Sequence, residues 1–403
     1  MNVKIQKSDI CGSVQIPPSK SVAHRMMIAA ALAHSHIDVS NGGRDVEATA
    51  RCLKALADNS DKCPVLNAGE SGSTLRFLLP VACALGRTLV FTGEGRLKDR
   101  PLDGLINCLR AHGAEIEKTS DSGLPLKVSG RLSAGDYRID GNVSSQYITG
   151  LLFALPLLDG DSNIVVGGSL VSANYVDITV DVLKKFGIAV RRTDSGFFVK
   201  GNQRYAMPDG VSVEGDWSSA GFMLALGVLA GEVSIGGLNA GSQQGDRVVV
   251  DLLKRAGANI VFSDGRYIAK KSRLSAIDFD AADCPDAVPI MATVLSFAKG
   301  VSHISSVDRL RDKESDRLFA VRKMLEGFGV KTEYGDDRLS VFGGTHTPCV
   351  MQSFNDHRMA MSAIVCALCA EGKSAVTGVE CIAKSYPDFL KDIASLGANI
   401  KTE

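Results

Sequence analysis

The chain has 403 residues, and its 45 Lys and Arg are balanced by 45 Asp and Glu, so its formal net charge is zero. This balance argues against a protein that wraps nucleic acid or lies on a membrane surface, because both need an excess of positive charge. A small anionic substrate stays possible, since a few arginines in one cleft do not change the sum. The length predicts roughly two or three domains of about 150 residues.

Neither a secretory signal nor a membrane span is expected. The first ten residues, MNVKIQKSDI, lack an apolar stretch, and the longest apolar runs, such as 148–158, fall short of the roughly 18 residues that a span needs. We therefore expect a cytoplasmic protein. Ten cysteines are scattered, mostly among apolar neighbours, and the single CxxC, at Cys366 and Cys369, lies in the apolar run AIVCALCA. This distribution favours buried thiols over disulfides, zinc or redox sites.

An amphipathic helical pattern recurs along the chain and is closed each time by a glycine. Its copies end at Gly113, Gly187, Gly257, Gly329 and Gly397, and a weaker copy lies around Ala57. Apolar residues at i, i+3 and i+4 predict a two-faced helix, and glycine suits the left-handed conformation that ends many helices. A strand is expected after each one.

A second, more apolar helical pattern alternates with the first. Its six copies begin near Ser21, Gly72, Ser144, Ser218, Asp286 and Asn355, and nearly all are followed by a glycine and a β-like run such as GRTLVFTG. Helices that are apolar nearly all round are expected inside, whereas the two-faced helices lie nearer the surface. The repeating unit is therefore strand, helix, strand, helix and strands, six times over.

Six units divide naturally as three plus three. Turn-forming residues mark two crossings, at Pro17-Pro18 and at Pro208-Asp209-Gly210. This predicts one domain of three repeats over 17–212 and a second over 1–16 plus 213–403. The opening segment 3–16 has no partner in its own half, so we expect it to pair with the C-terminal half, with two strands crossing between the domains.

Polar residues gather where the apolar helices begin. They are SKS at 19–21, ESGST at 70–74, SSQ at 144–146, DWSS at 216–219, PDA at 285–287 and NDHR at 355–358. Ordinary N-capping explains many of them, DWSS above all. It does not explain the cations Lys20, Arg25, Arg76, His357 and Arg358, which are costly to desolvate there. Because helix N-termini attract negative charge, several of them together predict an anion site.

Three charged clusters extend this pattern: GRLKDRP at 95–101, RLRDKESDR at 309–317 and AKSYPDF at 383–389. Taken singly, each is typical of a solvated surface. Taken together with the helix starts, they indicate a substrate that carries more than one phosphate or carboxylate.

At these residues the chain resembles the 5-enolpyruvylshikimate-3-phosphate (EPSP) synthase family, the 3-phosphoshikimate 1-carboxyvinyltransferases. The motifs PPSKSVAHR, ESGSTLR, GEGRLKDRP, SSQYITGLL, VSANYVDIT, PDAVPIMA, DKESDR, NDHRMAM and AKSYPDF follow the family's order over the whole length. DKESDR together with NDHRMAM is the most specific signal. The resemblance implies an α/β fold, a two-domain inside-out α/β barrel of six βαβαββ-type repeats, three per domain, whose chain crosses twice between the domains.

The resemblance also implies the reaction. The enolpyruvyl group of phosphoenolpyruvate is transferred to the 5-hydroxyl of shikimate 3-phosphate, with release of phosphate, by addition and then elimination, on the route to chorismate and the aromatic amino acids. No cofactor and no metal are expected. The two substrates are the expected partners, with no nucleic acid and no membrane, and we expect a monomer.

Each site residue takes its role from the resemblance. Asp286 would accept the proton of the 5-hydroxyl, Lys20 and Glu314 would handle protons at the phosphoenolpyruvate carbon and its bridging oxygen, and His357 would stand beside the phosphate. Shikimate 3-phosphate would be bound by Lys20, Ser21, Arg25, Ser144, Ser145, Gln146, Ser172, Tyr175, Asp286 and Lys313. Phosphoenolpyruvate would be bound by Lys20, Gly72, Arg100, Gln146, Arg317, Arg358 and Lys384, where the planar arginine fork suits carboxylate and phosphate.

Two positions depart from the family pattern, and two alternatives stay open. Glu70 stands where Asn is common, and Arg309 stands where some members have an Asn that touches shikimate 3-phosphate. One alternative is the related transfer to UDP-N-acetylglucosamine, whose enzymes carry a reactive Cys in the loop that here reads GEGRLKDRP. The other is a non-enzymatic six-repeat clamp on DNA, which should spread Lys and Arg over its inner helices.

Overall fold

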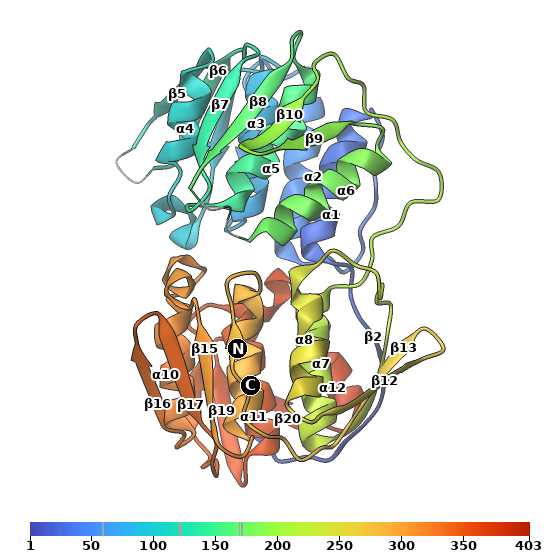
Figure 1. Cartoon of the computed structure of the whole chain (residues 1–403), viewed down its shortest axis with the longest axis vertical. Coiled ribbons are helices and arrows are strands. Elements are labelled where there is room, and N and C mark those ends of the chain that lie inside the picture. Colours follow the sequence, from blue (N-terminus) through green and yellow to red (C-terminus); the bar gives the residue numbers. More distant parts are fainter. Residues whose placement is uncertain (59, 121–122, 169, 171) are drawn as a thin grey trace. The chain divides into compact units, whose positions relative to one another are not determined.

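The structure is a computed structural model that describes residues 1–58, 60–120, 123–168, 170 and 172–403. These residues form two compact units, each with a hydrophobic core of its own (Figure 1). Ser19–Val213 make up one, called here the N-terminal unit. Met1–Pro18 and Glu214–Glu403 make up the other, the C-terminal unit. Two short segments, around residues 18 and 214, therefore connect the units.

Two kinds of helix alternate along the chain, as the sequence predicts. The N-terminal unit contains α1 (Lys20–Leu32), α2 (Arg44–Ala57), α3 (Gly72–Ala84), α4 (Asp103–Arg110), α5 (Ser145–Ala154) and α6 (Ala173–Lys185). The C-terminal unit contains α7 (Trp217–Ala230), α8 (Val248–Arg255), α9 (Val288–Ser296), α10 (Arg317–Gly327), α11 (His357–Cys369) and α12 (Phe389–Ser395). Nearly every residue of α3, α5, α7, α9 and α11 is buried.

The two-faced helices end as predicted. The glycines that follow α4, α6, α8, α10 and α12 all have a positive φ, from 79° at Gly187 to 99° at Gly113. A residue with a side chain would be strained in this conformation, which explains why the same residue type recurs at each helix end.

Five four-stranded sheets of one topology occur within the described ranges. The N-terminal unit has the orders β3-β4-β6-β5 and β7-β8-β10-β9, built from β3 (Val65–Asn67), β4 (Leu89–Thr92), β5 (Ala114–Lys118), β6 (Leu126–Gly130), β7 (Asp136–Asp140), β8 (Ser162–Gly167), β9 (Val190–Thr193) and β10 (Gly196–Val199). In each sheet the first pair of strands is parallel and the other two pairs are antiparallel. Such a sheet closes one repeat.

The C-terminal unit repeats this topology three times, in the orders β12-β13-β11-β2, β14-β15-β17-β16 and β18-β19-β1-β20. Its strands are β1 (Asn2–Gln6), β2 (Ile10–Gln15), β11 (Gly231–Gly236), β12 (Asn259–Ser263), β13 (Arg266–Lys270), β14 (Phe279–Asp280), β15 (Val301–Ser305), β16 (Thr332–Gly335), β17 (Arg338–Phe342), β18 (Val350–Gln352), β19 (Lys373–Thr377) and β20 (Asn399–Thr402). The five sheets and the twelve helices give six repeats, three in each unit.

The first repeat differs from the other five. It has the helix pair α1 and α2, but within the described residues it contributes no strand, because none of the segments 33–58, 60–64 and 200–213 forms one. The first and the last of these segments are rich in turn-forming residues, such as Asn41-Gly42-Gly43 and Pro208-Asp209-Gly210, which disfavour a continuous strand. The expected strand runs are therefore present in five repeats only.

The N-terminal segment pairs with the C-terminal half, as predicted. Strand β1 lies between β19 and β20, with Val3 opposite Val376 and Thr402, and β2 runs parallel to β11. Figure 1 shows the two chain ends side by side on the C-terminal unit. The connecting segments meet in a single bridge between Pro18 and Gly215, so the expected crossing strands are reduced to one residue pair.

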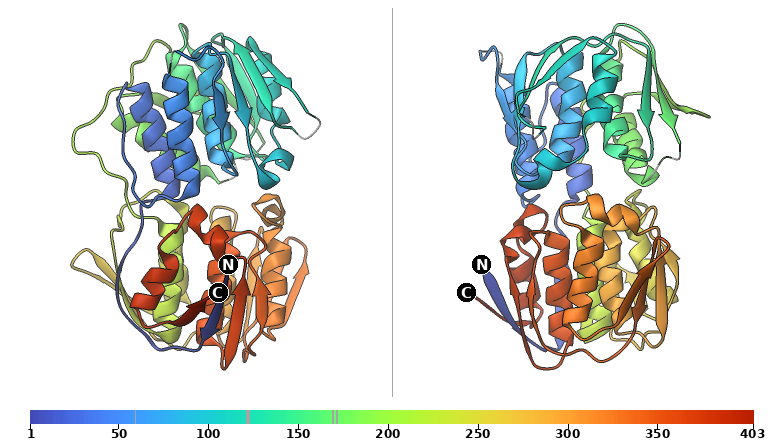
Figure 2. Two further views of the ribbon diagram at one scale, coloured as in Figure 1. Left: turned by 180° about the vertical axis from the view of Figure 1, so that it is seen from behind. Right: turned by 90° about the vertical axis from the view of Figure 1, so that its left-hand side faces the viewer.

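Each unit has a group of helices with sheets packed against it (Figure 2), and within that group the apolar helices are the buried ones. The approach of α5 to α3 depends on one small residue: a Cβ at Gly150 would lie 2.3 Å from the carbonyl oxygen of Arg76 and 2.9 Å from Pro80 Cγ. Any side chain at this position would push α5 away from α3, and α3 carries several of the predicted site residues at its N-terminus.

Candidate active site

The predicted site residues lie at or just before the N-terminal ends of helices, in both units. The N-terminal unit holds Lys20, Ser21, Arg25, Gly72, Arg100, Ser144, Ser145, Gln146, Ser172 and Tyr175. The C-terminal unit holds Asp286, Lys313, Glu314, Arg317, His357, Arg358 and Lys384. Within each unit these residues are brought into contact by helices that are far apart in sequence.

Capping accounts for some of the serines and aspartates at these helix starts. Ser19, Ser71 and Ser144 cap α1, α3 and α5, and each hydroxyl accepts a backbone N–H of the first turn. Asp216 and Asp356 cap α7 and α11 in the same way. Asp286 is different: it lies in the 3₁₀ turn Pro285–Ala287 ahead of α9, which has no side-chain cap, and its carboxylate faces cations instead.

Lys20 is fixed by a partner that the sequence did not reveal. Its Nζ lies 3.1 Å from Asp45 Oδ2 at the start of α2, and the two side chains are 15% and 14% exposed. A half-buried pair of this kind holds the ammonium in one place. Asp45 follows the turn Gly42-Gly43 at the start of a two-faced helix, which in sequence is indistinguishable from an ordinary acidic first turn.

Two arginines crowd the N-terminus of α3. A Cβ at Gly72 would lie 2.5 Å from Arg100 Nη1 and 2.6 Å from Arg76 Nη1, so both guanidinium groups reach over this glycine. Arg76 is 3% exposed, and burial together with the charge of Arg100 lowers its pKa to about 10. Two like charges at a helix N-terminus make this end of α3 strongly attractive to an anion.

Gln146 joins this group through Arg76, which the sequence analysis noted as a cation but did not assign to a ligand. Arg76 Nη1 donates to Gln146 Oε1 at 3.0 Å, and Gln146 Nε2 donates to Ser73 Oγ at 3.1 Å. Arg76 Nη2 donates to the carbonyl of Pro101 at 2.8 Å, which ties the loop of Arg100 to α3. Beside Arg100 this loop borders a cavity of about 310 Å³.

The remaining predicted contacts of the N-terminal unit surround α5 and α6. Ser145 and Ser172 are buried, and Ser172 has the left-handed conformation, with φ of 53°. The Tyr175 carbonyl accepts a hydrogen bond from Arg25 Nη2 at 2.9 Å. Arg25 therefore connects α1 to α6, and its environment is described further below.

In the C-terminal unit Asp286 is the centre of a group of cations. Its carboxylate lies 2.6 Å from Arg317 Nη1, 3.2 Å from Arg358 Nη2 and 3.5 Å from Lys313 Nζ. The desolvation that accompanies burial lowers the pKa of Lys313, although the charge of Asp286 opposes this shift. The four groups come from three separate parts of the sequence, and the fold brings them to one carboxylate.

Arg317 is almost fully enclosed by carboxylates. It is 1% exposed, and it donates to Asp286, to Glu314 Oε2 at 2.6 Å and through Nε to Asp356 Oδ2 at 2.7 Å. Burial opposes its charge, but the three carboxylates outweigh this effect and raise its pKa well above the usual value. The predicted phosphoenolpyruvate contact of Arg317 would have to compete with these partners.

Two buried aspartates that support this cluster were not predicted as site residues. Asp356 is 0% exposed, and besides Arg317 it binds Ser315 Oγ at 3.0 Å and the Arg358 backbone N–H at 3.0 Å. Asp246 Oδ2 lies 3.8 Å from Arg358 Nη1, and burial raises the pKa of Asp246 to about 6. Asp356 belongs to the motif NDHR and had a visible signal, whereas Asp246 stands in an unremarkable GDR turn.

His357 and Lys384 complete the predicted group in this unit. His357 is the first residue of α11 and is 1% exposed. Lys384 is buried at the end of a 3₁₀ turn, and its Nζ donates to the Asn355 carbonyl at 3.0 Å. Lys384 is therefore held against the loop that precedes His357.

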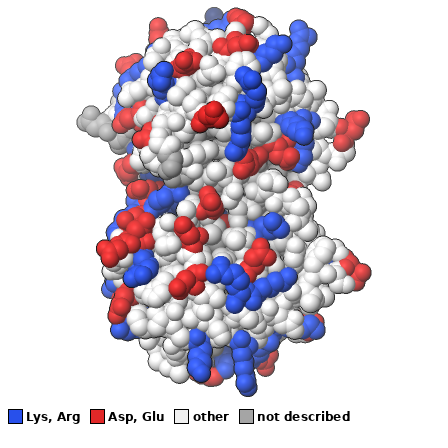
Figure 3. Space-filling view, in the orientation of Figure 1, with Lys and Arg blue, Asp and Glu red and all other residues white. Residues whose placement is uncertain are grey.

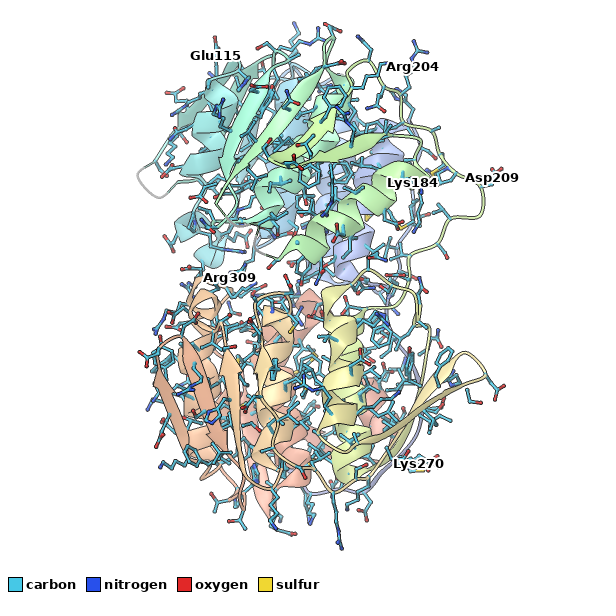
Figure 4. The ribbon with its side chains drawn as sticks, viewed as in Figure 1. Glu115, Lys184, Arg204, Asp209, Lys270 and Arg309 are labelled. Carbon is cyan, nitrogen blue, oxygen red and sulfur yellow. The ribbon has the colours of Figure 1, made fainter. Side chains whose placement is uncertain are left out.

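Glu70 and Arg309, the two departures from the family pattern, both contact neighbouring loops or backbone. A Cβ at Gly95 would lie 3.0 Å from Glu70 Cδ, so Glu70 packs against the loop of Arg100. Arg309, labelled in Figure 4, donates through Nη1 to the Ala282 carbonyl at 3.0 Å. The guanidinium of Arg309 is thus engaged with the backbone that leads to Asp286.

The described ranges hold neither a candidate metal site nor a candidate membrane span. Those residues contain no group of three or more His, Cys, Asp or Glu placed to hold a metal ion. No helix among them is long and apolar enough to cross a membrane. Figure 3 shows Lys and Arg intermixed with Asp and Glu on the displayed faces of both units, whereas a DNA clamp needs a basic surface.

Comparison with known families shows to which protein family the chain belongs. The family described as EPSP synthase (3-phosphoshikimate 1-carboxyvinyltransferase) matches residues 5–393. The chain belongs to the EPSP synthase family. It is accordingly a transferase that moves the enolpyruvyl group of phosphoenolpyruvate to shikimate 3-phosphate in aromatic amino acid biosynthesis, as the sequence predicts. The family match, together with relatives named 3-phosphoshikimate 1-carboxyvinyltransferase, favours this transfer over the two alternatives, transfer to UDP-N-acetylglucosamine and a clamp on DNA.

Relatives and solved structures agree with the EPSP synthase assignment. The chain is 40% identical to a 3-phosphoshikimate 1-carboxyvinyltransferase of Clostridium kluyveri, over 99% of this chain and 98% of that protein. It is 38% identical to one from Brachyspira hyodysenteriae, over 99% and 100%. An EPSP synthase structure from Acinetobacter baumannii aligns over 99% of both chains with a TM-score of 0.79 at 23% identity. The enolpyruvyl transferase NikO from Streptomyces tendae aligns over 99% and 98% with a TM-score of 0.76 at 18% identity, and both structures share the fold.

Proposed function

We propose that Lys20, Asp286, Glu314 and His357 carry out the chemistry of this transfer. Asp286 accepts the proton of the 5-hydroxyl, Lys20 and Glu314 handle the protons at the phosphoenolpyruvate carbon and bridging oxygen, and His357 stands beside the departing phosphate. The observation that carries the proposal is the cluster around Asp286, in which Lys313, Arg317 and Arg358 all reach one carboxylate.

Binding of the substrate anions would make the carboxylates of this cluster stronger bases. Arg317 divides its donors among Asp286, Glu314 and Asp356. A phosphate or carboxylate that draws Arg317 and Arg358 to itself weakens their hold on Asp286 and Glu314. A carboxylate that loses a cationic partner becomes a stronger base. Binding of phosphoenolpyruvate thus prepares the two groups for proton transfer.

The binding residues follow the same division. Shikimate 3-phosphate is bound by Lys20, Ser21, Arg25, Ser144, Ser145, Gln146, Ser172, Tyr175, Asp286 and Lys313, and phosphoenolpyruvate by Lys20, Gly72, Arg100, Gln146, Arg317, Arg358 and Lys384. The N-terminus of α3, with Arg76 and Arg100 above Gly72, supports an anion there. The Lys20–Asp45 pair supports a fixed ammonium that can pass a proton.

The decisive experiment measures phosphate release from phosphoenolpyruvate with shikimate 3-phosphate as acceptor, for wild type and for Asp286→Asn and Glu314→Gln. Both variants keep the size of the side chain and remove the charge. We expect kcat to fall by about 10²–10⁴-fold, the usual contribution of a general acid or base. UDP-N-acetylglucosamine offered as acceptor should give no turnover.

Asp312→Asn is the matched control, because Asp312 is exposed and lies in the same DKESDR motif. It should leave kcat within about twofold of wild type, a change that corresponds to less than about 0.5 kcal/mol. If Asp286→Asn or Glu314→Gln turned over as fast as Asp312→Asn, the role assigned to that residue would be wrong.

We also propose that the enzyme is a monomer of two domains, 17–212 and 1–16 plus 213–403, located in the cytoplasm. All ten cysteines are free thiols, which fits a reducing compartment. Sedimentation of the full chain with and without substrates tests the oligomeric state, and a mass of two chains at micromolar concentration would refute the monomer. Fractionation of the native host tests the location.

A further inference from the structure

Arg25 is a buried cation whose hydrogen-bond partners are all uncharged. Its side chain is 2% exposed, and burial lowers its pKa to about 9. Nη1 donates to the Ser21 carbonyl at 2.7 Å, and Nη2 donates to the Tyr175 carbonyl at 2.9 Å. The guanidinium also lies 4.9 Å from the centre of the Phe77 ring. No carboxylate pairs with Arg25 in the part of the chain that the structure describes.

Two threonine hydroxyls determine how this guanidinium is turned. Arg25 Nε donates to Thr179 Oγ1 at 2.8 Å, and Nη2 also reaches Thr149 Oγ1 at 3.4 Å. The two hydroxyl oxygens are 2.9 Å apart, and Thr179 donates to the Tyr175 carbonyl at 3.0 Å. Arg25, from α1, is therefore held by one threonine from α5 and one from α6.

Only one arrangement of hydrogens satisfies these contacts. A hydroxyl has one proton and two acceptor lone pairs. Thr179 gives its proton to Tyr175, so Thr149 must give its own proton to Thr179, and both lone pairs of Thr179 are then used, by Arg25 Nε and by Thr149. Four of the five guanidinium N–H groups are engaged within the described residues, and one on Nη1 is left to bind a ligand.

We propose that Thr149 and Thr179 are positioning residues that orient the Arg25 guanidinium and thereby set the affinity for shikimate 3-phosphate. This inference rests on the proposed binding role of Arg25. A buried positive charge with neutral partners attracts an anionic ligand more strongly than one already paired with a carboxylate. The attraction depends on orientation, because the N–H left on Nη1 binds the ligand only while the other four N–H groups are held in place.

Thr179→Val tests this directly, since valine keeps the shape of threonine and lacks the hydroxyl. The change removes the partner of Arg25 Nε and of the Thr149 hydroxyl, and one of the two donors to the Tyr175 carbonyl. We expect the KM for shikimate 3-phosphate to rise about tenfold, equivalent to 1.4 kcal/mol. The kcat and the KM for phosphoenolpyruvate should change by less than about threefold. Thr149→Val should act in the same direction but less, because its contact with Arg25 is longer.

Thr293→Val is the matched control. Thr293 is a fully buried helical threonine of α9 whose hydroxyl donates to the carbonyl four residues earlier, that of Pro289, at 2.9 Å. Thr179 makes the same kind of backbone contact with Tyr175, but within the described ranges Thr293 has no arginine partner to orient. Thr293→Val should leave both KM values unchanged, and Thr179→Ser, which restores the hydroxyl, should bring the KM for shikimate 3-phosphate back to within about twofold of wild type.

Arg25→Ala separates this inference from the assignment on which it rests. Titration calorimetry of the full chain with shikimate 3-phosphate alone gives the dissociation constant for each variant. Weaker binding in Arg25→Ala and in Thr179→Val, with rescue by Thr179→Ser, supports the inference. Weaker binding in Arg25→Ala alone would overturn the role of the threonines, whereas unchanged binding in Arg25→Ala would overturn the role of Arg25 itself and the inference with it. An equal loss of binding in Thr179→Val and Thr293→Val would also refute positioning.

Discussion

Asp356→Ala should destabilise the C-terminal unit far more than the loss of a helix cap alone. The Asp356 carboxylate accepts from Arg317 Nε at 2.7 Å, from Arg317 Nη2 at 3.3 Å, from Ser315 Oγ and from the Arg358 backbone N–H. Arg317 and Asp356 are 1% and 0% exposed, so water cannot replace the lost partner. Removing one member of a buried ion pair costs about 3–5 kcal/mol, and removing an N-cap costs about 1 kcal/mol.

The expected loss in the free energy of unfolding is therefore about 4–6 kcal/mol for Asp356→Ala. Asp316→Ala is the matched control, because Asp316 caps the neighbouring helix α10 and its nearest charged partner is Arg311, 3.9 Å away and half exposed. It should cost only about 1 kcal/mol. Asp356→Asn keeps the cap and one acceptor oxygen and should fall between the two.

Trp217 makes this measurement specific for the unit concerned. It is the only tryptophan of the chain, it lies in α7 of the C-terminal unit, and it is fully buried. Its fluorescence during urea denaturation therefore reports the unfolding of this unit. If Asp356→Ala and Asp316→Ala had free energies of unfolding within about 1 kcal/mol of each other, Asp356 would act as a cap only, and the reasoning from the buried pair would be refuted.

Three further predictions concern pH, packing and thiols. Burial raises the pKa of Asp246 to about 6, above its unfolded value near 3.8. Wild type should therefore lose stability relative to Asp246→Asn as the pH rises from about 4 to 6. If the free energies of unfolding of the two proteins, followed by Trp217 fluorescence, changed in parallel over this pH range, the prediction would be wrong. Gly150→Ala should lower the free energy of unfolding by about 1–3 kcal/mol in urea titrations followed by circular dichroism. Gly104→Ala is the control, because its Cβ would meet only Tyr147 at 3.6 Å, and it should be neutral or stabilising. Equal effects of the two changes would refute the close approach of α5 to α3. A thiol reagent at pH 8 should modify the exposed Cys11 and Cys63 quickly and the other eight cysteines slowly, because the other eight are buried or half-buried. A fast phase that survives in the double variant Cys11→Ser/Cys63→Ser would show that another thiol is accessible.

Much of the candidate site could be located from the sequence because its residues stand where helices begin. Ser19, Ser71 and Ser144 are caps, and the cations next to them exceed what capping needs. Lys20 and Arg358 could be predicted for this reason, since a charged residue at the start of an apolar helix is conspicuous. Their assignment to particular substrates came from the family resemblance, and it stays a prediction.

The partners of these cations could not be predicted. Asp45 and Asp246 lie in ordinary acidic turns, and only the fold brings the first to Lys20 and the second to Arg358. The same holds for Thr149 in the apolar helix α5 and Thr179 in the two-faced helix α6, which face one guanidinium. A threonine or an aspartate has no periodic signature, because its role depends on which neighbour the folded chain places against it.

The sequence by itself determined the six repeats and their helices, because periodic burial and a glycine at each helix end are local properties that recur about every 70 residues. It also determined that β1 and β2 join the C-terminal half, since they have no partner in their own. Only the tertiary structure decided that the described part of the first repeat has no sheet, and that Arg317 is enclosed by three carboxylates whereas Arg25 is buried among neutral groups. Burial and charge pairing are sums over residues far apart in the chain, so they exist only once the chain has folded.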